Sequence, residues 1–162
     1  MHDSLYFSDD HLQVRDMVRD FARTVVKPAA RQYDLESRFP WDNIKQMADL
    51  GLFGIPWAEE LGGSGMDYLS YITVIHELAK VDASHAITVS AHTTLGTSPI
   101  VDFGTDDQKR RFVPLLATGK VLGGFGLTEP GAGSHAGGTN TTAVDRGDHY
   151  VLNGSKIFIT HA

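Results

Sequence analysis

The sequence contains no cysteine. This absence excludes a disulfide framework, a thiolate nucleophile and a cysteine-ligated zinc site. The sequence also has no run of about 18 apolar residues, which a membrane-spanning helix needs, and its first residues lack the basic and then apolar order of a signal peptide. We therefore expect a cytoplasmic protein, or a mitochondrial matrix protein in a eukaryote, with no membrane partner.

Positive charge is also scarce. The 14 Lys and Arg residues are outnumbered by 20 Asp and Glu residues, so the formal net charge is −6. A nucleic-acid surface needs clustered cations, and we expect no nucleic-acid partner. The one basic cluster, Lys109-Arg110-Arg111, follows two aspartates and is expected to be a solvated helix face.

The remaining composition is that of an ordinary globular protein. Hydrophobic residues make up 41% of the 162 residues, and glycine, with 17 residues, is the only type in generous supply. A chain of this length is expected to form one domain, or one domain and part of another, and to bury roughly 70% of its unfolded surface.

The first 120 residues carry helix signals. Apolar residues recur at helical spacing, and Ser8 and Thr105 stand where a hydroxyl can cap the start of a helix. Pro28 is expected to kink the first helix or to break it in two. Helices are predicted over residues 8–34, 40–50, 68–81 and 105–119, with a loop over residues 54–67.

Residues 84–103 are ambiguous by propensity. Ile87, Val89 and Thr93 favour a strand, and Pro99 interrupts either kind of element. On propensity alone, helix and strand both remain open for this stretch.

From residue 121 the pattern changes to short apolar or alternating runs, which predict strands over residues 121–127, 139–144, 149–152 and 156–160. Gly147-Asp148 and Asn153-Gly154 are turn signals, and the second is a strong hairpin signal. The predicted fold class is α+β, with an all-α helical domain over residues 1–120 and the beginning of a β-domain over residues 121–162. Because a sheet this small needs a packing partner, we expect the chain to be a piece of a longer protein.

The segment GLTEPGAGSHAGG, residues 126–138, concentrates glycine in one place. It lacks the context of a dinucleotide fingerprint, because the TNTTAV that follows it predicts a strand and not a helix. A glycine-rich bend whose amides, with Thr128 and Ser134, face an anionic or strongly polar ligand is one interpretation. A glycine-rich turn without a ligand is the other.

The sequence predicts neither a histidine metal site nor a catalytic dyad. The eight histidines include no His-Glu-x-x-His pattern, and His85 and His92 are expected to be core or surface residues and not metal ligands. Ser134 and His135 are adjacent, so they are not expected to converge as a catalytic dyad. Glu129, before a proline, is predicted to be an acceptor that stabilises the turn and not a base.

Two separated segments carry a resemblance to a known family. FGLTEPGAGSHAGG is followed by YVLNGSKIFIT, and both come after LGLFGIPWAEELGGSGMDYLSY and FGTDDQKRRFVPLLATG. Over essentially its whole length the chain resembles the N-terminal half of an acyl-CoA dehydrogenase. The resemblance implies a three-domain flavoenzyme, truncated here before its C-terminal four-helix bundle, and it assigns residues 84–103 to helix.

The resemblance implies FAD as the cofactor. Thr128 would bond the flavin ring, Ser134 would lie near the pyrophosphate and the acyl-CoA substrate, and Phe158 would back the flavin where many members have Trp. The implied cofactor-binding residues are Phe125, Leu127, Thr128, Gly133, Ser134, Phe158, Ile159 and Thr160, and Ser134 is also the implied substrate contact. No metal site is implied.

The chemistry that the resemblance implies is α,β-dehydrogenation of an acyl-CoA to a trans-2-enoyl-CoA, a step of fatty acid β-oxidation. Electrons would leave to an electron-transferring flavoprotein, and members are commonly homotetramers. The family's catalytic glutamate belongs to the C-terminal domain, so no catalytic residue is expected in this chain and the isolated chain is expected to be inactive. An acyl-CoA oxidase or flavin monooxygenase of the same fold, and a non-catalytic helical module that binds an acyl group or a partner, remain alternatives.

His135 departs from the family, which usually has Asp at this position. A carboxylate could accept hydrogen bonds from several loop amides, whereas a neutral imidazole has one acceptor nitrogen. The histidine therefore offers the loop around Ser134 fewer acceptors than the family's usual carboxylate.

Overall fold

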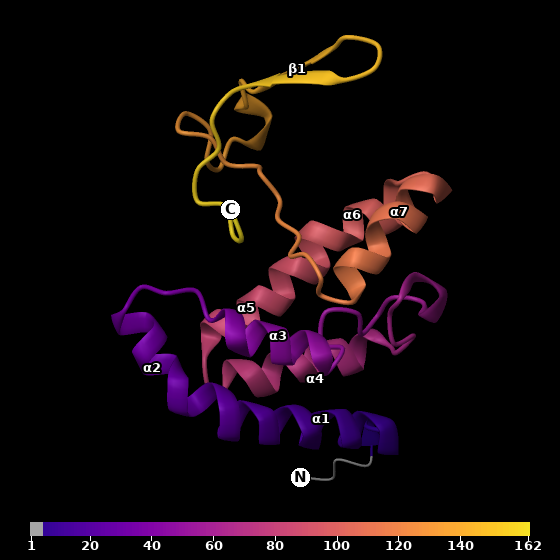
Figure 1. The fold of residues 1–162 in the computed structure, drawn as a ribbon, viewed down its shortest axis with the longest axis vertical. Helices are drawn as coiled ribbons and strands as arrows, with labels where there is room; N and C mark the ends of the chain where they lie inside the picture. The colour runs from indigo at the N-terminus through magenta and orange to yellow at the C-terminus, as the bar shows by residue number, and fades with distance from the viewer. Residues whose placement is uncertain (1–4) are drawn as a thin grey trace. The chain divides into compact units, whose positions relative to one another are not determined.

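The computed structural model describes residues 5–162, and the chain divides between Gly123 and Gly124 into two compact units (Figure 1). The first unit is helical, and the second holds a short antiparallel sheet. The predicted α+β class is confirmed.

Helices make up most of the first unit. They are α1 (Asp9–Phe21), the π-helix η2 (Ala22–Val26), α2 (Lys27–Leu35), α3 (Trp41–Asp49), the 3₁₀-helix η3 (Glu59–Leu61), α4 (Tyr68–Ala79), α5 (Ala83–Ala91), the π-helix η4 (His92–Thr97), α6 (Ser98–Phe103) and α7 (Asp106–Ala117). The four predicted helices are confirmed, with small differences at their ends. In residues 5–162 no helix combines the length and the apolar character that crossing a bilayer requires.

Two of these helices begin at the predicted caps. The Ser8 hydroxyl accepts a hydrogen bond from the His11 backbone N–H at 3.4 Å, and the His11 ring accepts one from the Ser8 N–H at 2.9 Å. Thr105 and Gln108 make the same reciprocal pair at the start of α7. Each pair provides partners for backbone donors that a helix start otherwise leaves free.

A π-helix precedes each of two prolines. The Lys27 N–H bonds to Ala22 O ahead of Pro28, and the Ser98 N–H bonds to Thr93 O ahead of Pro99. Proline has no N–H to donate, and the wider turn lets the helix pass each proline without a break. The expected disturbance at Pro28 is therefore a π-turn inside one continuous helical segment.

Residues 84–103 are helical, as the resemblance implied. Val89 is fully buried, and His85, Thr88 and Thr93 are nearly so. The Thr88 hydroxyl donates to Ser84 O at 2.9 Å, one turn back in the helix. Packing of these buried side chains in the core outweighs the strand propensity of the β-branched residues, because tertiary context routinely overrides propensity.

The core of the first unit surrounds α4, which packs against both α1 and α5. Its largest fully buried side chains include Phe53, Met47, Leu52 and Leu78. Burying an apolar side chain of this size contributes roughly 1.5–3 kcal/mol, so this cluster is the main stabilising feature of the helical unit.

The second unit contains the 3₁₀-helix η5 (Ala136–Gly138) and the strands β1 (Thr142–Asp145) and β2 (Tyr150–Asn153). The strands pair antiparallel, with Thr142 opposite Asn153. Gly147, with a φ of 94°, forms the turn between them, and the Arg146 N–H donates to His149 O at 2.9 Å. The predicted strands at 139–144 and 149–152 and the turn at Gly147-Asp148 are confirmed.

Three local predictions in this unit are wrong. Residues 121–127 and 156–160 are not strands, and Asn153-Gly154 does not form a hairpin. After Gly154 the chain bonds elsewhere, since the Ile157 N–H donates to Thr128 O at 2.9 Å. Phe158 has a φ of 56°, which is left-handed and incompatible with a continuing strand. A single backbone bond does not make the ladder that a strand requires.

Candidate functional site

The glycine-rich segment of the second unit is organised around Glu129, which is buried. Its carboxylate accepts hydrogen bonds from the N–H groups of Asn140 at 2.6 Å and Thr141 at 2.9 Å, and from the Lys156 ammonium at 2.8 Å. The Asn140 N–H and then Lys156 are the main causes that lower the pKa of Glu129 to about 2. The carboxylate stays ionised near neutral pH, and the prediction that Glu129 is an acceptor is confirmed.

A tight turn closes next to this carboxylate. The Glu129 N–H donates to Ala132 O at 3.1 Å, and the Ala132 N–H donates back to Glu129 O at 3.0 Å. The side chain of Ala132 is buried. The base of the loop is therefore fixed by backbone bonds, while residues 133–137 beyond it are exposed.

Lys156 joins the second predicted segment to the first. Besides its ion pair with Glu129, its ammonium donates to Leu127 O at 3.0 Å. The next residue, Ile157, donates its N–H to Thr128 O at 2.9 Å. Residues 127–129 and 156–157 thus lie side by side, although the hairpin separates them in the sequence.

The predicted cofactor-binding residues flank this junction. Phe125, Leu127 and Phe158 expose 46%, 42% and 91% of their surface, so their apolar side chains are accessible to a ligand. Phe158 combines this exposure with a left-handed backbone, a strained state that clusters at functional sites. The exposed members of the predicted set also include Gly133, Ser134 and Thr160, and the partly buried ones are Thr128 and Ile159.

Two glycines of the loop have no structural requirement within this chain. A Cβ added to Gly131 or Gly133 would meet no atom within 4 Å, and neither residue is among the glycines with positive φ. Glycine also permits the close approach of a ligand to the backbone. The backbone at Gly131 and Gly133 therefore leaves room for a ligand.

His135 packs on its own loop. Its carbonyl accepts a hydrogen bond from the Gly138 N–H at 2.9 Å. A Cβ on Gly138 would lie 2.7 Å from the Nδ1 atom of His135, so the exposed imidazole would have to shift if Gly138 were replaced. The ring therefore covers the backbone that follows it.

The two central histidines belong to the core of the first unit, which decides between the two locations expected of them. His85 Nε2 lies 3.0 Å from Asn43 Nδ2, and its Nδ1 contacts the Asp82 carboxylate. His92 Nδ1 accepts from the Gly123 N–H at 3.0 Å, and its Nε2 lies 3.1 Å from Leu116 O. Among the described residues, no group of three His, Asp or Glu side chains is arranged to hold a metal ion.

Sequence reasoning missed Lys156. It is a single cation between a glycine turn and a short apolar run, and no pattern of residue types marks it. Its importance comes from its distance to Glu129, which only the folded chain reveals.

Comparison with known proteins identifies relatives of both units. The family model described as the acyl-CoA dehydrogenase N-terminal domain matches residues 8–120, and the middle-domain model matches residues 124–162. The chain is 50% identical over 148 residues to the short-chain specific acyl-CoA dehydrogenase of Clostridium acetobutylicum, a match that covers 91% of this chain and 39% of that protein. It is 40% identical over 159 residues to CarC, a subunit of the caffeyl-CoA reductase–Etf complex of Acetobacterium woodii, covering 98% and 42% of the two chains.

A solved structure supports the same assignment. The crystal structure of an acyl-CoA dehydrogenase complexed with FAD from Bacillus anthracis matches with a TM-score of 0.87 and 37% identity, covering 96% of this chain and 27% of that one. The chain spans 39–42% of the length of the curated relatives compared.

Proposed function

Because this chain belongs to the acyl-CoA dehydrogenase family, we propose that it provides the helical domain and part of the flavin-binding middle domain of an FAD-dependent acyl-CoA dehydrogenase. The reaction is the conversion of an acyl-CoA to a trans-2-enoyl-CoA. The observation that carries the proposal is the junction of Thr128 with Ile157, since it brings together the two segments expected to contact the flavin.

The residues of this chain bind and orient the cofactor. Thr128 and Phe158 would hold the flavin ring system, and the bare backbone at Gly133 with Ser134 would hold the pyrophosphate. The exposed aromatic surface and the open space at Gly131 and Gly133 support this arrangement. The Glu129–Lys156 pair acts indirectly, because it holds the two segments together.

Bound FAD supplies the hydride-accepting chemistry of α,β-dehydrogenation. The chain's own contribution is a positioned and partly apolar surface, since accurate placement of reacting groups lowers the barrier. Glu129 is not proposed as the base that removes the substrate α-proton. Its carboxylate is held by three donors with a pKa of about 2, so it is a poor proton acceptor near neutral pH.

We propose an electron-transferring flavoprotein as the electron acceptor, which the name of the CarC relative supports. The whole protein is proposed to be a homotetramer of the cytoplasm, or of the mitochondrial matrix in a eukaryote, and to act in fatty acid β-oxidation.

Anaerobic titration of the FAD-loaded protein that contains this chain tests the proposal. Butyryl-CoA is a suitable first substrate, because a relative is named as short-chain specific. We expect the visible flavin absorption to bleach and to recover when electron-transferring flavoprotein is added. Failure to retain FAD, or no bleaching with any acyl-CoA, would contradict the proposal. Rapid recovery with oxygen alone would indicate an oxidase or a monooxygenase.

A further inference from the structure

The first unit has a groove between the α1–η2–α2 segment and the C-terminal end of α4. Its volume is about 400 Å³, and its lining residues are Arg19, Arg23, Lys27, Glu77, Lys80 and Val81. We call it the basic groove. Four of its six lining residues are cationic, in a chain whose formal net charge is −6. Such local excess of positive charge attracts anions.

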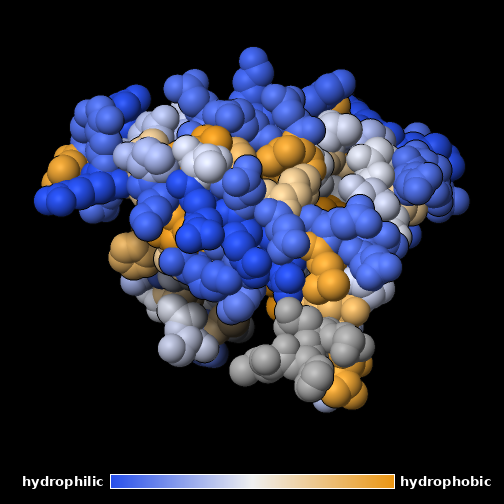
Figure 2. All heavy atoms as spheres, turned by 90° about the horizontal axis from the view of Figure 1, so that it is seen from below, coloured by the Kyte–Doolittle hydropathy of each residue, from blue (hydrophilic) through white to orange (hydrophobic). Residues whose placement is uncertain are grey.

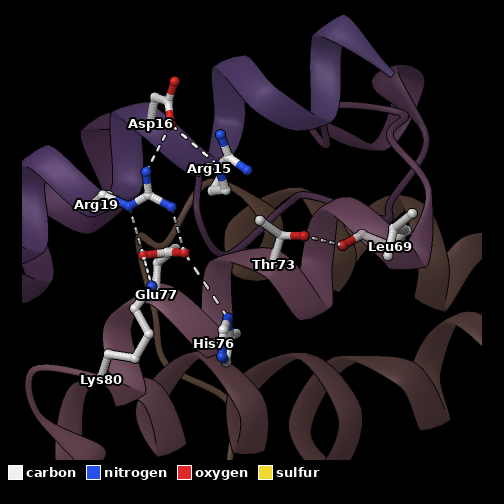
Figure 3. Close-up of polar contacts among 8 residues, drawn as sticks. All are labelled: Arg15, Asp16, Arg19, Leu69, Thr73, His76, Glu77 and Lys80. Atoms are coloured by element: carbon white, nitrogen blue, oxygen red, sulfur yellow. Dashed lines mark hydrogen bonds and ion pairs between the residues drawn. The ribbon is translucent and has the colours of Figure 1, made fainter. Parts of the chain in front are cut away.

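The floor of the basic groove is a buried ion pair network (Figure 3). The Glu77 carboxylate is 3% exposed and receives two hydrogen bonds from the Arg19 guanidinium, each of 3.1 Å. The Lys80 ammonium forms an ion pair of 2.5 Å with the same carboxylate. Arg19 also donates to the Asp16 carboxylate at 3.2 Å, so Arg19 and Lys80 are fixed in place by two carboxylates.

The other two cations of the basic groove are Arg23 and Lys27, and neither has an ion-pair partner among the described residues. In the part of the chain that the structure describes, no hydrogen bond or ion pair involves the charged group of Arg23 or Lys27. Both residues are exposed, and the face that carries α1 is mainly hydrophilic (Figure 2). Their donors are therefore available to a ligand.

The π-helix explains why these cations share one groove. Arg19, Arg23 and Lys27 follow one another at intervals of four residues. In an α-helix each interval of four turns the side chain roughly 40° past the previous one. A π-helix has more residues in each turn, so η2 (Ala22–Val26) reduces this drift and keeps all three side chains over the groove.

We propose that the basic groove binds a small molecule that carries two linked phosphoryl groups. Each phosphoryl group carries a charge of about −1.5 to −2 near neutral pH when terminal. Arg19 and Lys80 are balanced by Glu77 and Asp16, so Arg23 and Lys27 leave an excess of two positive charges to attract it. The Arg23 guanidinium offers the planar fork that suits phosphate oxygens, and Lys27 offers a point charge. All of these residues belong to the first unit.

The size of the groove favours a small molecule over an acidic protein segment. Its volume of about 400 Å³ lies in the range of small-ligand pockets, which runs from roughly 300 to 1,000 Å³. A stable protein partner needs roughly 1,200 Å² or more of buried surface in total. The cationic lining is confined to three residues of the α1–η2–α2 segment and to Lys80, directly after α4. A compact dianion or trianion therefore fits both the charge and the size.

Isothermal titration calorimetry of the 162-residue chain with inorganic pyrophosphate at low salt tests this proposal. We expect saturable binding with one site, and we expect the Arg23→Gln/Lys27→Gln double variant to bind at least about tenfold more weakly. The matched control is Arg110→Gln/Lys120→Gln, which removes the same charge from exposed positions outside the groove and should bind within about twofold of the parent chain. Circular dichroism of both variants checks that each is folded.

Three results would overturn the proposal. The first is no saturable binding of pyrophosphate, and the second is an equal loss in the groove and control variants, which would indicate only the general field of surface charge. The third is tighter binding of an oligoglutamate peptide than of pyrophosphate, which would assign the groove to an acidic protein segment. Lys80→Gln, a change at the groove floor, should also weaken binding, and unchanged binding would count against the assigned location.

Discussion

Lys156 and Glu129 lie 27 positions apart in the sequence, and their side chains form an ion pair of 2.8 Å. This pair bonds the segment that follows the hairpin to the glycine-rich loop that precedes it. The Glu129 carboxylate is buried, and Lys156 is only partly exposed. Solvent and salt therefore screen this pair less than an ordinary surface ion pair. The proposed flavin surface depends on this contact.

Replacing Lys156 tests that dependence. Lys156→Gln removes the ammonium that bonds Glu129 and Leu127 O, so the two segments lose their side-chain link. We expect the affinity for FAD, measured by quenching of flavin fluorescence, to fall about tenfold. Lys120→Gln, which changes an exposed lysine of the first unit, is the control. Unchanged flavin affinity in Lys156→Gln would argue against a supporting role for the pair.

Two glycine-to-alanine substitutions distinguish an effect on the free energy of unfolding from an effect on the affinity for FAD. Gly131→Ala meets open space, so we expect the free energy of unfolding to stay the same or to rise by about 0.4–1 kcal/mol, while FAD affinity falls. Gly96→Ala places a Cβ 2.5 Å from the carbonyl carbon of Gly123. It should destabilise the helical unit by about 1–3 kcal/mol. Urea unfolding and flavin titration give the two measurements, and full flavin affinity in Gly131→Ala would contradict close approach at that glycine.

His135→Asp tests the family's usual residue in this loop. An aspartate can accept bonds from more than one loop amide, whereas the imidazole cannot. We expect flavin affinity to be maintained or increased. His149→Asp, in the turn between β1 and β2, should leave it unchanged. A clear loss of affinity in His135→Asp alone would show that the loop is built around the histidine.

Glu77 is expected to be important for the packing of α1 on α4. Glu77→Gln weakens the bonds from Arg19 and Lys80 to a buried group, so we expect a loss of about 1–3 kcal/mol in the free energy of unfolding. Urea unfolding followed by the fluorescence of Trp41 and Trp57 measures it. The exposed Glu60→Gln should change stability by less than about 0.5 kcal/mol, and equal effects of the two changes would contradict a structural role for Glu77.

Acid should weaken the start of α4 through Asp67. Its carboxylate accepts from the Ser70 N–H and contacts the His11 ring, and these bonds lower the pKa of Asp67 to about 2. A lowered folded-state pKa adds stability above the unfolded value of about 3.9. That stability is lost as the pH falls through about 2.

Asp67→Asn keeps a good helix cap and removes this titration. We expect the variant to lose less stability than the parent chain when urea unfolding at neutral pH is compared with unfolding in acid. Asp107→Asn, in the first turn of α7, is the control and should follow the parent. If Asp67→Asn loses as much stability in acid as the parent chain does, the acid effect does not come from Asp67.

Local signals in the sequence were reliable where the interaction itself is local. The caps at Ser8 and Thr105 join residues three positions apart, and the turn at Gly147 needs only a glycine that accepts positive φ. Residues 84–103 could not be assigned by propensity, because their helical state depends on which face is buried. The Asn153-Gly154 signal failed because the chain after it bonds to Thr128 and not to β2.

The sequence by itself determined the helices over residues 8–34, 40–50, 68–81 and 105–119, the family and the two segments expected at the flavin, since these depend on residue types and their order. Only the tertiary structure decided that Lys156 meets Glu129, that Gly131 and Gly133 face open space, and that Arg19, Arg23 and Lys27 share a groove with Glu77. Lys156 and Glu129 are far apart in the sequence, as are Glu77 and the three cations of the first helical segment, so only the packing of the folded chain sets the distances between them.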